Sequence, residues 1–98
     1  MDLSEIRKQI DEIDDSIVRL FCERMHLSAQ VADYKMAHQL PIHVPEREQQ
    51  ILDSLTQKAG PELGRYVCDL YQAIFVISRD YQEKHMYRAA TELTEVIP

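Results

Sequence analysis

The chain has 98 residues and a mass of 11.5 kDa, close to the common size of one independent domain. Lys and Arg number 11 against 17 Asp and Glu, so the net charge is −6, which argues against nucleic-acid binding. Hydrophobic residues make up 45%, enough for a core, while only 2 Gly and 4 Pro disfavour an all-β fold. No apolar run approaches the roughly 20 residues of a membrane helix, and the N-terminus is not a signal peptide. We therefore expect a soluble, cytoplasmic all-α protein.

The first third of the sequence predicts one long helix. Apolar residues recur there at spacings of three and four, the rhythm of a heptad seam. They are Ile6, Ile10, Ile13, Ile17, Leu20, Leu27, Val31 and Tyr34. No Gly or Pro precedes Pro41, so the helix should run from about residue 3 to about residue 38. A helix on the order of 50 Å long does not fit a compact monomer of this size, so we expect a homodimer with intertwined long helices.

Proline and glycine residues predict where two further helices begin and end. The prolines of residues 38–45 predict an ordered loop, and Pro45 with Glu46 predicts the start of a second helix. Gly60 and Pro61 predict its end.

The third helix should occupy about residues 62–85, where apolar residues again follow helical spacing. The tail, residues 86–98, is ambiguous, since it could extend this helix to Thr94 or fray. We expect a single domain over residues 1–98, with a three-helix core over about 3–85.

Two cations break the pattern of the long helix. Arg24 interrupts the apolar seam, and such a charge is costly unless an anion pairs with it. It could equally lie near the surface and pair with Glu23 or Asp33, and the seam alone leaves both interpretations open. Lys35 follows 11 residues later, almost three full turns, so both cations project to similar sides. Arg7 lies roughly 100° around the axis from Arg24, so it cannot easily serve the same site but could serve the site of a dimer mate.

Polar residues on the other helices are weaker signals. Ser78 and Gln82 are four residues apart, on one helical face that continues an apolar stripe. They fit the polar lining of a cavity, although an ordinary amphipathic edge explains them better in isolation. Arg47 and Glu48 by composition alone are solvated residues at a helix start. The histidines lack metal-ligand spacing, so we expect no metal, and no nucleophilic arrangement or phosphate loop indicates a cofactor.

Three segments together resemble the all-helical chorismate mutases, the AroQ type. They are LSEIRKQIDEIDDSIVRLFCERMHLSAQVADYK, PEREQQIL and YQAIFVISRDYQ, within a similarity that extends from about Leu3 to about Lys84. The resemblance implies three helices per subunit, an intertwined dimer, and the rearrangement of chorismate to prephenate in Phe and Tyr biosynthesis. It implies no cofactor, and an enzyme of the aromatic pathway is a candidate partner.

The same resemblance implies roles for the cations. Arg7 should cross from the partner subunit to bind one substrate carboxylate, and Arg24 should bind the other. Lys35 should reach a carboxylate and the ether oxygen. Lys35, Gln82 and Arg24 are thus the expected catalytic residues.

Four more positions match the family pattern. Arg47 corresponds to an arginine lining the site, and Glu48 to the acid that holds the ring hydroxyl. Ser78 and Gln82 correspond to a polar pair, of which Gln82 meets the ether oxygen. One position departs: Val44 stands where some members have an Asp, which could weaken substrate binding.

Alternatives of other kinds stay open. An isochorismate pyruvate lyase that makes salicylate uses the same scaffold and similar cations, although Glu48 favours the mutase. A non-catalytic regulatory or partner-binding dimer would be expected to lose cations, and none is lost. A generic coiled-coil protein does not explain Arg24 in the seam.

Overall fold

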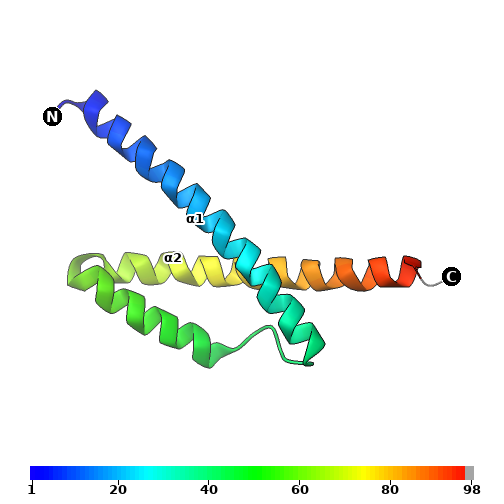
Figure 1. The fold of residues 1–98 in the computed structure, drawn as a ribbon. Coiled ribbons are helices and arrows are strands. Elements are labelled where there is room, and N and C mark those ends of the chain that lie inside the picture. Colours follow the sequence, from blue (N-terminus) through cyan, green and yellow to red (C-terminus); the bar gives the residue numbers. More distant parts are fainter. Residues whose placement is uncertain (97–98) are drawn as a thin grey trace.

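The computed structural model describes the backbone of residues 1–96 and the side chains of residues 1–92. It is built from two helices, α1 (Leu3–Ala37) and α2 (Pro45–Val96), joined by a loop (Figure 1). The expected all-helical class is confirmed. Neither helix within the described residues is long and apolar enough to cross a membrane.

Helix α1 begins and ends close to the expected positions. Asp2 caps its start, because its carboxylate accepts the backbone N–H of Glu5 at 2.9 Å while the Glu5 side chain accepts that of Asp2. At the other end the backbone N–H of His38 bonds to the carbonyl of Tyr34. Gln39 then takes a positive φ of 55°, which turns the chain into the loop.

Helix α2 bends back on itself at Gly60, where φ 86° and ψ 174° are not helical. This conformation is accessible essentially to glycine alone, and Pro61 then suits the first turn of the continuing helix. Helix α2 thus has two arms, residues 45–59 and 61–96, which lie side by side (Figure 1). The expected second and third helices are these two arms of α2, so the described residues form two helices where three were expected, and the second arm continues beyond residue 85 to Val96. Residues 97–98 of the expected tail lie outside the described part.

The arms approach each other closely near the bend. A Cβ on Gly64 would lie 3.0 Å from both the methyl group and the carbonyl oxygen of Thr56. A side chain at position 64 would therefore require the two arms to move apart by a few tenths of an ångström.

Helix α1 crosses the second arm of α2 and extends far beyond it (Figure 1). The radius of gyration is 17.7 Å, against about 13 Å for a compact chain of this length. Among the described side chains the buried apolar ones are only Met25, Ala32 and Phe75, all near the crossing. Ile10, Ile13 and Ile17 on the free half of α1 are about half exposed. The core therefore sits at the crossing, where it positions the site.

Candidate active site

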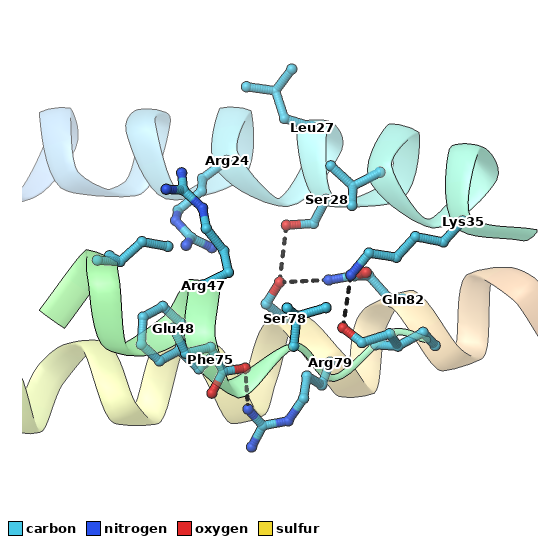
Figure 2. A pocket seen from close by; sticks show the side chains of 14 residues that line it. Arg24, Leu27, Ser28, Lys35, Arg47, Glu48, Phe75, Ser78, Arg79 and Gln82 are labelled. Carbon is cyan, nitrogen blue, oxygen red and sulfur yellow. Dashed lines mark hydrogen bonds and ion pairs between the residues drawn. The ribbon is translucent and has the colours of Figure 1, made fainter. Parts of the chain in front are cut away.

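A cavity of about 300 Å³ lies where α1, the loop and both arms of α2 meet (Figure 2). Six of the seven expected site residues line it. They are Arg24, Lys35, Arg47, Glu48, Ser78 and Gln82. The helical spacing on α1 and the bend at Gly60 together bring these residues to one place.

Arg24 faces the cavity, and none of the carboxylates that the structure describes pairs with it. Its guanidinium carbon lies 5.9 Å from the ring centre of Tyr71 and 6.0 Å from that of Phe75. Contact with aromatic faces holds a guanidinium without neutralising it. The two acids that could have paired with it are engaged elsewhere: Glu23 with Arg19 at 3.4 Å and Asp33 with His85 at 2.7 Å. The surface-pair interpretation of Arg24 is therefore not what the structure shows.

Lys35 is oriented by the loop. Its Nζ donates to the carbonyl oxygen of Ile42 at 2.8 Å, a bond that is partly buried. The ammonium has donors to spare, because the Ile42 carbonyl engages only one of its three N–H groups. Val44, at the position where some family members have an Asp, lines the same cavity without offering a polar group.

Arg47 and Glu48 come from the first turn of α2. Glu48 is bonded through Oε2 to the guanidinium of Arg79 at 2.5 Å, while His43 lies 3.6 Å from its Oε1. Arg47 also lines the cavity and, within the described part of the chain, pairs with no acid. Arg79 lines the cavity too and was missed by the sequence analysis, although it directly follows Ser78 on the chain.

Three buried polar residues form a chain of hydrogen bonds across the crossing (Figure 2). The Ser28 and Ser78 hydroxyls lie 3.0 Å apart, and Gln82 Nε2 donates to Ser78 Oγ at 3.2 Å. All three side chains are more than nine-tenths buried. Ser28 was also missed, although it stands one turn after Arg24 on the face that carries the cations.

Arg7 is not part of this cavity within one chain. It is exposed on the free half of α1, about 25 Å along the helix from Arg24. A single chain therefore does not bring all seven expected residues together.

The arrangement suits the binding of a small anion. Arg24, Lys35 and Arg47 bring three positive charges to one cavity, while the charge of Arg79 is balanced by Glu48. Among the residues described, no group of three or more His, Cys, Asp or Glu could hold a metal ion. The fold and the cavity thus define an all-helical protein with a cationic small-molecule site.

Comparison with known proteins identifies the family. The sequence matches chorismate mutase type II over residues 6–83, and the chain belongs to this family. It is 49% identical over 53 residues to a chorismate mutase of Methanocaldococcus jannaschii, covering 54% of each chain. It is also 46% identical over 54 residues to a bifunctional chorismate mutase/prephenate dehydratase of Aquifex aeolicus, covering 55% of this chain and 15% of that one. The matches thus span about half or less of these relatives.

A solved structure agrees with the fold. Chorismate mutase (Form II) from Thermus thermophilus superimposes with a TM-score of 0.78 at 30% sequence identity. The match covers 83% of this chain and 93% of that one.

Proposed function

We propose that the protein is a chorismate mutase, which rearranges chorismate to prephenate. The observation that carries the proposal is the convergence of Arg24, Lys35 and Arg47, none paired with an acid in the described part of the chain, on one cavity. Chorismate is a dianion, and arginine forks bind carboxylates through two parallel hydrogen bonds. Membership of the family supplies the reaction.

The reaction places few demands on side-chain chemistry. One C–O bond breaks while one C–C bond forms within a single molecule, so no nucleophile or proton carrier takes part. Rate is gained by holding the flexible substrate in its compact reactive conformer. It is also gained by placing positive charge and hydrogen-bond donors where negative charge grows on the ether oxygen.

The polar residues of the cavity that the sequence predicted then have roles in this proposal. Arg24 binds one carboxylate, and Lys35 binds a carboxylate and the ether oxygen. Gln82 donates a hydrogen bond to the ether oxygen, and Ser78 lies beside it.

The first turn of α2 supplies two further roles. Glu48 accepts a hydrogen bond from the ring hydroxyl, and Arg47 lines the site. Val44 lacks the carboxylate with which, in some members of the family, an Asp at this position helps to hold the ring hydroxyl or the lysine.

The proposal includes a homodimer, in which each subunit comprises α1 and the two arms of α2. Its support is the half-exposed apolar stripe on α1 and the small core of one chain. A second copy would cover that stripe, since apolar surface of this extent is unfavourable in water. Arg7 of one subunit would then enter the cavity of the other and bind the second carboxylate.

The proposal also covers the domain organisation and a partner enzyme. We take residues 1–98 as one domain, since the described helices share one small core at the crossing. The bifunctional relative, whose printed name joins a mutase to prephenate dehydratase, supports an aromatic-pathway enzyme as a partner.

The test is product analysis with the purified protein. Chorismate and isochorismate are supplied separately, and prephenate and salicylate are resolved by chromatography. Prephenate from chorismate supports the proposal. Salicylate from isochorismate without prephenate would identify the lyase instead, and turnover of neither would point to a non-catalytic dimer.

A further inference from the structure

The buried end of Gln82 is incompletely satisfied. Its Oε1 is buried and, within the part of the chain that the structure describes, accepts no hydrogen bond. Its Nε2 instead donates to Ser78 Oγ, so the proton donor points toward the protein. Burying an amide oxygen without a hydrogen-bond partner costs free energy, so a bound ligand can readily favour another orientation of the Gln82 amide.

A half-turn of the amide exchanges its two ends without moving the side chain. Oε1 then accepts from the Ser78 hydroxyl, and both N–H groups occupy the position at which Oε1 has no partner among the described residues, so they are available to an acceptor on a ligand. This orientation requires the Ser78 hydroxyl to donate toward Gln82. A serine within a helix has a competing acceptor, the carbonyl one turn earlier on its own helix.

Ser28 lies where it can determine whether the Ser78 hydroxyl donates to Gln82 or to the carbonyl of its own helix. Its hydroxyl is 3.0 Å from that of Ser78, and the pair joins α1 to the second arm of α2. When Ser28 donates to Ser78 Oγ, it fixes the rotamer of Ser78 and leaves the Ser78 proton to face Gln82. Hydrogen bonds arranged in such a series also strengthen one another.

We propose that Ser28 is a positioning residue, which acts through Ser78 to turn the Gln82 amide so that its N–H groups face the ether oxygen of the bound substrate. Ser28 does not touch the substrate in this account. The inference rests on the proposed mutase function for its kinetic consequence. The orientation of the amide itself is independent of the reaction.

The kinetic test is a double-mutant cycle on kcat/KM for chorismate. Ser28→Ala should lower kcat/KM about fivefold, the effect of one hydrogen bond. In a Gln82→Met background the same substitution should change kcat/KM by less than about twofold, because the residue through which it acts is gone. Ser16→Ala is the matched control, since Ser16 is exposed on α1 and, among the described residues, bonds only to the Glu12 carbonyl. An equal loss in both backgrounds, or no loss in either, would overturn the proposal.

A second measurement does not depend on activity. The side-chain amide signals of Gln82 in a ¹H–¹⁵N spectrum, assigned by their absence in Gln82→Met, should move in Ser28→Ala and stay in place in Ser16→Ala. Unmoved signals would overturn the positioning role. If the wild type leaves chorismate intact, the proposed function fails while this measurement still decides the role of Ser28. Far-UV circular dichroism verifies that each variant is folded.

Discussion

Arg79 and Glu48 join the two arms of α2 at the rim of the cavity, although they are 31 residues apart in sequence. Their side chains are only 26% and 23% exposed, so the pair is largely shielded from water. The contact fixes a carboxylate that we propose receives the ring hydroxyl of the substrate, and it ties the site to the fold.

Arg79→Met should therefore affect both stability and binding. The substitution keeps much of the volume but leaves Glu48 with only the longer contact to His43, which should cost on the order of 1 kcal/mol of unfolding free energy and raise KM. Urea unfolding and steady-state kinetics measure the two effects. Arg19→Met is the control, because the exposed Arg19–Glu23 pair on α1 should contribute almost nothing. Equal effects of the two substitutions would contradict the role of Arg79.

Gln82→Glu should make activity depend on acidic conditions. An amide donates a hydrogen bond at any working pH, whereas the introduced carboxyl donates only when protonated. Burial of position 82 raises the pKa of that carboxyl, whereas the cations that line the same cavity lower it. Activity should be present below this pKa and fall about tenfold per unit above it. Profiles of kcat/KM for the wild type and for Gln82→Glu, from about pH 5 to about pH 8, test this expectation. Parallel profiles of the two proteins would count against Gln82 as the ether partner.

Gly60→Ala should destabilise the bend between the arms. Apart from its chain neighbours, no described residue has an atom within 4 Å of the added Cβ, so the cost arises from the backbone, whose φ of 86° is strained for a residue with a side chain. We expect a loss of about 1–3 kcal/mol in unfolding free energy. Urea titration at fixed protein concentration, which matters for a dimer, measures it. Unchanged stability would show that the bend tolerates another conformation.

Arg7 can be tested by mixing two inactive variants. In the proposed dimer each site uses Arg24 of one subunit and Arg7 of the other. An equimolar mixture of Arg7→Ala and Arg24→Ala chains, refolded together, should form hybrid dimers with one intact site and recover about a quarter of wild-type activity. No recovery above the separate variants would place Arg7 outside the partner's site.

The helical elements were predictable because local signals mark them. The apolar seam defines α1, Pro45 begins α2, and Gly60 with Pro61 bends it. Arg24 and Lys35 could be placed on one side from helical spacing alone, and both line the cavity.

The missed contacts depend on how distant segments meet. The Arg79–Glu48 pair requires the bend to set the register of the two arms, and no local pattern encodes that register. The same holds for Ser28 opposite Ser78, which depends on where α1 crosses α2. Lys35 bonds to a backbone carbonyl of the loop, and every residue type offers such a group.

In the proposed mechanism the substrate's carboxylates are held by cations that pair with no carboxylate among the described residues, and Arg24 tests this most directly. The measurement is kcat/KM for chorismate in Arg24→Met, with Arg19→Met as the control on the same helix. Loss of a charge-assisted pair should lower kcat/KM by at least about tenfold in the first variant and leave the second near wild type. Wild-type kcat/KM in a folded Arg24→Met protein would contradict the account.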